Sequence, residues 1–170
     1  FVLGESCIAR FYRQYYPFSE KVVATEHEMV FTLDGDENYR IKGIIDRVDH
    51  DGNGNWEIHD YKTGKRAMSN KEADRDHQLA LYQIGLMAET DNIQSVKLVW
   101  HFIQHGKRIE SSRNPEQIRK VIVDTKNSID EIRERMKNGG TFSPKKTILC
   151  NWCYYWEECP VQTGSNLYIS

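Results

Sequence analysis

The stretch that decides the fold is GIIDRVDHDGNGNWEIHDYKTG, residues 43–64. It holds two segments rich in β-branched and aromatic residues, and the Asn/Gly cluster DGNGN separates them at residues 51–55. Asn and Gly tolerate positive φ and therefore close hairpins between antiparallel strands. The stretch thus predicts two neighbouring strands, residues 39–50 and 55–63, which carry Asp46, Asp60 and Lys62.

Further elements follow on both sides of this hairpin. Strands are expected at residues 21–33, 95–103 and 107–112, where Val, Ile, Thr and aromatic residues are frequent. Helices are expected at residues 4–16 and 72–89, and from Pro115 to the Asn-Gly-Gly stop at residues 138–140. This order predicts an α/β fold with one mixed sheet of four to five strands flanked by helices. We expect a single domain over residues 1–170, with an N-terminal helix in 1–20, a core in 21–140 and a cysteine-rich tail in 141–170.

Composition and charge restrict the functional classes. The 170 residues include 23 Lys and Arg against 25 Asp and Glu, a net charge of −2, so no global positive field indicates a nucleic-acid partner. Such binding would need a local basic patch, for which Lys62, Lys65, Arg66 and Lys71 are the candidates. No apolar run approaches the roughly 20 residues that span a bilayer, and there is no signal peptide. We therefore expect no membrane association and a cytoplasmic location. The chain begins without Met, so we also expect it to be a fragment or processed piece.

The D-x-K pattern at residues 60–62 points to chemistry on a phosphodiester. Side chains two residues apart on a strand share one face, so Asp60 and Lys62 project together while Tyr61 points the other way. Asp46 on the neighbouring strand can reach the same place. Two carboxylates suit Mg²⁺ or Mn²⁺, which activates water, and a nearby lysine can stabilise developing charge. A single D-x-K is explained as well by a surface salt bridge, so the neighbouring motifs are needed.

Other polar residues carry weaker signals. Gln78 and Tyr82 lie four apart and share one helix face, where both can line a cleft. Glu26 and Glu28 fit a solvated strand face about as well as a site. His59 and His77 have no ligand spacing, and His59 should face away from Asp60.

Three of the four cysteines lie within ten residues, as C-x₂-C-x₅-C at Cys150, Cys153 and Cys159. This spacing favours an intracellular metal or iron–sulfur site over a disulfide framework. Zn²⁺ is an alternative that needs a fourth ligand. Cys7 is the remaining cysteine.

The motifs GIIDRVD, IHDYKTG and QLALY together resemble the RecB/AddB branch of the PD-(D/E)XK nucleases, over roughly residues 21–160. The resemblance implies a restriction-endonuclease-like core. It implies that Asp46 and Asp60 bind the metal and that Tyr61 offers its backbone carbonyl to it. Lys62 would then be catalytic, and Gln78 and Tyr82 would position the lysine and the nucleic-acid backbone.

The cysteine pattern is similar to that of AddB-type and CRISPR-adaptation nucleases. This similarity implies a [4Fe–4S] cluster held by Cys150, Cys153 and Cys159 with Cys7 as the fourth ligand. Two features depart from the family pattern, because no proline follows Cys7 and no histidine precedes His27.

These observations predict a divalent-metal-dependent DNA nuclease, of exonuclease type, that acts on single-stranded DNA or free DNA ends. A helicase or recombination partner is expected, in DNA repair, recombination or phage and CRISPR DNA processing. Two alternatives stay open: a catalytically impaired nucleic-acid-binding domain of the same fold, and a scaffold stabilised by Zn²⁺.

Overall fold

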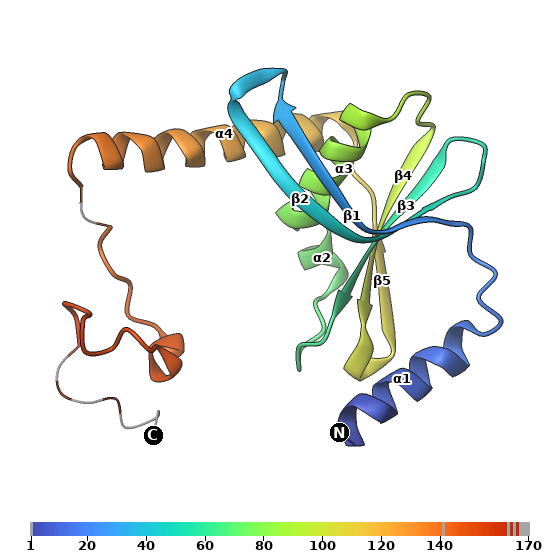
Figure 1. Cartoon of the computed structure of the whole chain (residues 1–170), viewed down its shortest axis with the longest axis horizontal. Coiled ribbons are helices and arrows are strands. Elements are labelled where there is room, and N and C mark those ends of the chain that lie inside the picture. The colour runs from blue at the N-terminus through green and yellow to red at the C-terminus, as the bar shows by residue number, and fades with distance from the viewer. Residues whose placement is uncertain (1, 141, 163, 165, 167–170) are drawn as a thin grey trace. The chain divides into compact units, whose positions relative to one another are not determined.

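The computed structural model describes residues 2–140, 142–162, 164 and 166 (Figure 1). The chain forms two compact units, residues 1–128 and 129–170, and each is described by itself. The division of the sequence at residues 20 and 140 stays a prediction.

The first unit is built on one five-stranded sheet. Its strands, in sequence and in spatial order, are β1 (Val22–Leu33), β2 (Asp36–His50), β3 (Asn55–Lys62), β4 (Ser95–Phe102) and β5 (Lys107–Ser111). All neighbours are antiparallel except β3 and β4, which are parallel. The mixed sheet and its flanking helices confirm the predicted α/β fold.

The β2–β3 connection has the expected hairpin geometry. Gly52 and Gly54 have φ of 88° and 85°, a region that favours glycine. Asp51 Oδ1 accepts hydrogen bonds from the backbone N–H groups of Asn53 and Asn55. The turn fixes the register of the two strands, with Arg47 opposite His59.

The described residues contain four α-helices: α1 (Val2–Tyr15), α2 (Asn70–Ala73), α3 (His77–Glu89) and α4 (Pro115–Lys137). The expectation of one helix over 72–89 is wrong, because α2 ends at Ala73 and a new helix begins at His77. Asp76 causes this restart, since its Oδ1 accepts the Leu79 N–H at 2.9 Å as an N-cap.

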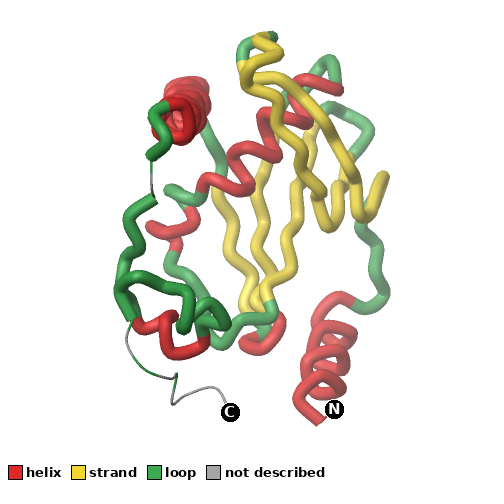
Figure 2. The backbone as a smooth tube through the Cα atoms, turned by 60° about the vertical axis from the view of Figure 1, so that its left-hand side comes forward, coloured by secondary structure: helices red, strands yellow, loops and turns green. Residues whose placement is uncertain are grey.

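Helix α3 packs across one face of the sheet, which we call the front face, and contacts β1 to β4 (Figure 2). Its approach to β1 is close, because a Cβ on Gly85 would lie 2.4 Å from Met29 Sδ and 2.7 Å from Phe31 Cε1. The apolar core between α3 and the sheet includes the fully buried Ile58, Leu79 and Trp100. Helix α1 contacts the short 3₁₀ helix η1 (Ile103–His105) between β4 and β5.

The second unit contains the end of α4 and the tail. Its described part has one 3₁₀ helix, η2 (Ile148–Trp152), and a hydrogen bond from Trp156 Nε1 to the Gly164 carbonyl. In the part of the chain that the structure describes, no helix has the length and apolar character needed to cross a bilayer.

Candidate active site

The end of β3 brings a carboxylate and an ammonium together on the front face. Lys62 Nζ donates a hydrogen bond to Asp60 Oδ1 at 3.0 Å and lies 2.8 Å from Asp60 Oδ2. Asp46 on β2 joins them through the backbone, because its Oδ2 accepts the Tyr61 N–H at 2.7 Å. The three residues singled out by the sequence therefore lie at one place on two adjacent strands.

Helix α3 adds Gln78 and Tyr82 to this group. Gln78 Oε1 accepts a hydrogen bond from Lys62 Nζ at 2.8 Å, and Gln78 Nε2 donates to Tyr82 Oη at 3.0 Å. The result is a continuous line from Asp60 through Lys62 and Gln78 to Tyr82. Gly43 of β2 makes room for the end of this line, since a Cβ there would lie 3.0 Å from the Tyr82 ring.

The electrostatics of Asp60 are unfavourable in the free protein. Asp60 is 4% exposed, and burial raises the pKa of its carboxyl above the ordinary value. The hydrogen bond from Lys62 opposes this shift, and the negative charge of Asp46 adds to it. The buried Asp60 Oδ2 also has no hydrogen-bond donor among the described residues, although Lys62 Nζ is near.

A divalent cation fits this donor set. Asp46, Asp60 and the Tyr61 carbonyl would supply oxygen ligands, the type that Mg²⁺ and Mn²⁺ prefer. A cation beside Asp60 would favour the ionised carboxylate that burial now disfavours. Within the described residues no group of three or more His, Cys, Asp or Glu side chains is placed to hold a metal ion. A metal here would therefore need ligands beyond these side chains, such as backbone oxygen, water or substrate.

The opposite face of the same strands, which we call the back face, holds a second polar cluster. Arg47 Nε donates to Asp49 Oδ1 at 2.7 Å, and Arg47 Nη1 donates to Tyr61 Oη at 3.2 Å. His59 Nε2 lies 3.2 Å from Asp49 Oδ2, and His59 Nδ1 lies 2.9 Å from His101 Nε2. Every one of these side chains is largely buried, so the cluster is part of the interior of the fold.

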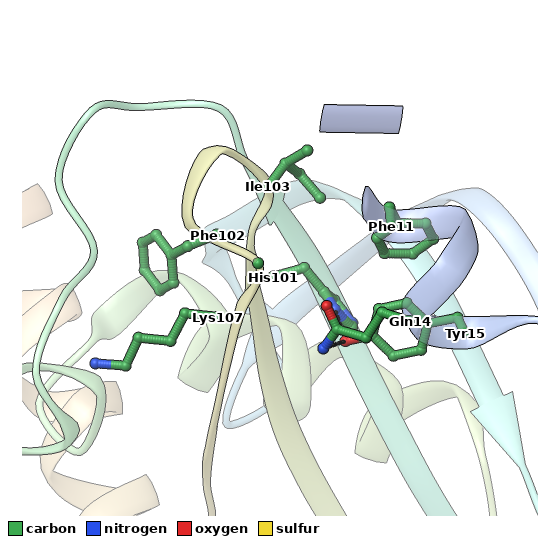
Figure 3. A pocket seen from close by; sticks show the side chains of 8 residues that line it. Phe11, Gln14, Tyr15, His101, Phe102, Ile103 and Lys107 are labelled. Carbon is green, nitrogen blue, oxygen red and sulfur yellow. Dashed lines mark hydrogen bonds between the residues drawn. The ribbon is translucent and has the colours of Figure 1, made fainter. Parts of the chain in front are cut away.

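The N-terminal helix closes this cluster from outside. Tyr15 Oη lies 3.0 Å from His101 Nδ1, and the Phe11 and Tyr15 rings meet His101 edge to face. Figure 3 shows Phe11, Gln14 and Tyr15 of α1 beside His101, in a small pocket that Phe102 and Lys107 also line.

Burial lowers the pKa of His59 to about 4 and that of His101 to about 3, so both imidazoles are neutral near pH 7. With neutral rings and an accepting carboxylate at Asp49, the Tyr15 hydroxyl donates to His101 and His101 donates to His59. These donations run in one direction, from Tyr15 to His59. The buried His59 Nε2 lies near Asp49 but has no hydrogen-bond partner among the described residues. The cluster has the character of a structural network.

Sequence reasoning placed His59 on the face away from Asp60, where it lies, but did not anticipate the cluster around it. The available signal was the pattern of β2 and β3, in which polar residues occur at consecutive positions and so must occupy both faces. His77 begins α3, and Glu28 forms an exposed ion pair with Lys42 at 2.8 Å. Glu26 has a positive φ of 48° and lies in β1 between the partners of Arg47 and Ile45.

All four cysteines are free thiols. Cys7 is buried in α1, and Cys150 lies in η2 of the second unit. Since the side chains described contain no group of three placed to hold a metal ion, the structure does not gather Cys150, Cys153 and Cys159 into a formed site. The iron–sulfur and Zn²⁺ assignments, and the participation of Cys7, stay predictions.

Comparison with known proteins bears on the fold and the family. The solved structure of SSO0001 matches with a TM-score of 0.52 and 18% identity, over 93% of this chain and 68% of that one. A protein of Eubacterium rectale named "Putative exonuclease" matches with a TM-score of 0.58 and 18% identity, over 97% and 62%. This chain therefore spans about two thirds of the length of both. No curated protein matches it.

The family model described as the PD-(D/E)XK nuclease superfamily matches residues 5–160. This range contains the sheet, α3 and every residue of the front-face line. The chain belongs to the PD-(D/E)XK nuclease superfamily.

Proposed function

We propose that this chain is a divalent-metal-dependent DNA nuclease that hydrolyses phosphodiester bonds with the front-face residues. The observation that carries the proposal is the unbroken hydrogen-bonded line Asp60–Lys62–Gln78–Tyr82, with the Asp46 carboxylate beside it. A purely structural sheet end has no need for a buried carboxylate with a raised pKa.

Each residue has a role that follows from its contacts. Asp46, Asp60 and the Tyr61 carbonyl would hold the cation, which when bound supplies Lewis-acid activation of water and neutralises phosphate charge. Lys62 presents its ammonium where negative charge develops at the phosphate. Gln78 restrains Lys62 through its amide oxygen, and Tyr82 orients the Gln78 amide.

We further propose exonuclease activity of the RecB/AddB type, in DNA repair, recombination or phage and CRISPR DNA processing. The combination of the GIIDRVD, IHDYKTG and QLALY motifs supports this, and the name of the Eubacterium rectale neighbour agrees with it. A cytoplasmic location and a helicase or recombination partner belong to the same proposal.

The tail supports a second proposal, a [4Fe–4S] cluster on Cys150, Cys153, Cys159 and Cys7, with Zn²⁺ as the alternative. Its support is the C-x₂-C-x₅-C spacing and the free state of all four thiols. Iron, sulfide and zinc content of protein purified without oxygen distinguishes the two metals. A Cys7→Ser protein with full metal content would remove Cys7 from the site.

The nuclease proposal is tested with end-labelled single- and double-stranded DNA in Mg²⁺, Mn²⁺ or EDTA. We expect cleavage that requires the metal, and a Lys62→Ala variant that stays folded and cleaves on the order of 10²–10³ times more slowly. Lys97→Ala is the matched control, because Lys97 is also a half-exposed strand lysine paired with a carboxylate, Glu57, on the back face. Equal cleavage by the Lys62 variant and the parent would remove the lysine from the mechanism.

A further inference from the structure

An open pocket of about 380 Å³ lies directly beside Lys62. Gly64, Arg66 and Met68 line it from the segment that follows β3, and Phe102 lines it from the end of β4. The acidic residues Glu72 and Asp76 also line it. The pocket therefore adjoins the proposed reactive centre, and the chain that leaves Lys62 forms one of its walls.

The backbone of this wall is held from the neighbouring turn, although its side chains are exposed. Gln104 Nε2 donates to the Thr63 carbonyl at 2.5 Å. His105 Nε2 lies 3.0 Å from the Lys65 carbonyl, and it must carry the proton because a carbonyl only accepts. Arg10 of α1 donates to the Gln104 carbonyl at 2.5 Å and so fixes the turn itself. Residues 63–66 are thus a preorganised loop.

The segment that follows β3 carries only positive charge. Lys62, Lys65 and Arg66 fall within five residues, and no acidic residue occurs from 61 to 69. Lys65 forms no ion pair with any residue that the structure describes. In a chain of net charge −2, this is a local concentration of positive charge on the segment that follows β3.

Arg66 has a partner that it can leave at low cost. It forms an ion pair with Glu72, and its own side chain is 80% exposed. The other oxygen of Glu72 accepts the Ser69 N–H at 2.7 Å in a capping box, so Glu72 keeps a donor when Arg66 turns away. An exposed ion pair of this kind contributes little to the stability of the fold.

We propose that loop 63–66 is a binding subsite for a nucleic-acid backbone phosphate adjacent to the bond cleaved at Lys62. Lys65 and Arg66 supply the charge, and Gln104 and His105 hold the loop that presents them. The inference rests on the proposed nuclease function. It assigns a ligand to loop 63–66, which lies outside the hydrogen-bonded line Asp60–Lys62–Gln78–Tyr82. Phosphate contacts of this type position a strand without reading its sequence.

The test measures DNA binding separately from cleavage. Binding of a labelled oligonucleotide is followed by fluorescence anisotropy in EDTA over a range of NaCl concentrations. The double variant Lys65→Gln/Arg66→Gln should bind several-fold more weakly, and its slope of log Kd against log salt should fall by about two. In Mg²⁺ the same variant should show a raised KM for DNA and a nearly unchanged kcat, because the lost contacts act equally in ground and transition states.

Arg40→Gln/Lys42→Gln is the control, since it removes two exposed charges from β2 and gives the same change in net charge. A Lys65/Arg66 variant with the salt slope of this control, in a parent protein that cleaves DNA, overturns the subsite and leaves the nuclease proposal standing. A parent protein that neither binds nor cleaves DNA overturns both.

A second pair of variants tests whether His105 positions loop 63–66. His105→Leu removes the donor to the Lys65 carbonyl and should weaken DNA binding, whereas His105→Gln, whose amide can donate, should restore most of the affinity. Equal binding by the two variants, at equal melting temperature, would show that His105 does not position the loop.

Discussion

Strand β3 carries polar groups on both of its faces, and the two groups differ in how they are paired. On the front face, Asp60 and Lys62 contact each other and Gln78, with the Asp46 charge nearby. On the back face, His59 and Tyr61 belong to a cluster with Arg47, Asp49 and His101. The residues alternate along one strand, so a single backbone positions both clusters.

The pKa shifts of Asp60 on the front face and Asp49 on the back face have opposite directions. Burial raises the pKa of Asp60 and no partner fully offsets it, whereas burial would also raise that of Asp49 but the hydrogen bond from Arg47 brings it below the ordinary value. The same bond raises the pKa of Arg47. The charges of Arg47 and Asp49 on the back face therefore neutralise each other, whereas Lys62 compensates the Asp60 carboxylate on the front face only in part.

This contrast shows that burial of polar side chains does not by itself mark an active site. The back face has more buried polar residues, and most of them pair with one another beneath α1, but His59 Nε2 has no hydrogen-bond partner among the described residues. The front face keeps a carboxylate whose charge is incompletely compensated, which is the arrangement that a cation and a phosphate would complete. The back-face cluster then holds β3 in place through His59 and Tyr61, and β3 carries Asp60 and Lys62 on its front face.

The largest effect should come from breaking the back-face pair with Arg47→Met. The change leaves Asp49 buried without its main donor, which typically costs about 3–5 kcal/mol of the free energy of unfolding. Urea titration of the metal-free protein measures this loss. Lys42→Met is the control on the same strand, because its ion pair with Glu28 is exposed and should contribute less than about 1 kcal/mol.

On the front face, removing a charged group should raise the stability of the metal-free protein, whereas Arg47→Met on the back face lowers it. Asp60→Asn should slow cleavage on the order of 10²–10³-fold or more, as for other groups that stabilise the transition state, yet raise the melting temperature in EDTA. The reason for the gain is that a raised folded-state pKa makes the ionised form of Asp60 unfavourable near pH 7.

Added Mg²⁺ sharpens this prediction. It should raise the melting temperature of the parent protein and leave that of the Asp60→Asn variant nearly unchanged. A variant less stable than the parent in EDTA would mean that Asp60 is structurally paired, like Asp49, and the contrast between the two faces would be lost.

The sequence predicted the front face better than the back face, for a physical reason. Asp60, Lys62 and Gln78 are set by local spacing, two apart on a strand and on one face of a helix, and the hairpin turn brings Asp46 beside them. The back-face cluster depends on His101 of β4 and Tyr15 of α1, which reach His59 only through tertiary packing. The helix break at residues 74–76 was missed because Asp76 caps α3 inside a continuous helical pattern.

Acid should destabilise the back face by an intermediate amount. The folded-state pKa values of His59 and His101, about 4 and about 3, lie below the usual 6.5. Their contribution to stability is therefore complete above pH 6.5 and is lost as the pH falls toward 4, because the unfolded chain binds protons first. Between pH 7 and pH 5 the free energy of unfolding should fall by on the order of 2 kcal/mol for each of the two imidazoles.

In the same pH titration, the two faces change the free energy of unfolding in opposite directions. The raised pKa of Asp60 gives a contribution that is complete at low pH and is lost as the pH rises through it, so it opposes the histidines. His101→Phe should flatten the acid loss, and Asp60→Asn should make it steeper. Stability that stays constant from pH 7 to pH 5 in the parent would contradict the neutral, buried state of the two imidazoles.

The smallest effect should come from Tyr15→Phe, which removes only the hydroxyl that meets His101 Nδ1 at 3.0 Å. The ring stays, with its packing against Phe11 at 4.5 Å. The loss is that of the hydrogen bond with His101 and of the long one from Gln14 Nε2 at 3.4 Å, together about 1 kcal/mol. Hydrogen exchange should locate the loss in the amides of α1, and Tyr16→Phe, which changes an exposed tyrosine next to it, should have no effect. Because Tyr15 reaches Asp60 only through His101, His59 and the strand, cleavage should change less than tenfold. A loss of cleavage by Tyr15→Phe as large as that of Asp60→Asn would mean that the back-face cluster takes part in the reaction itself.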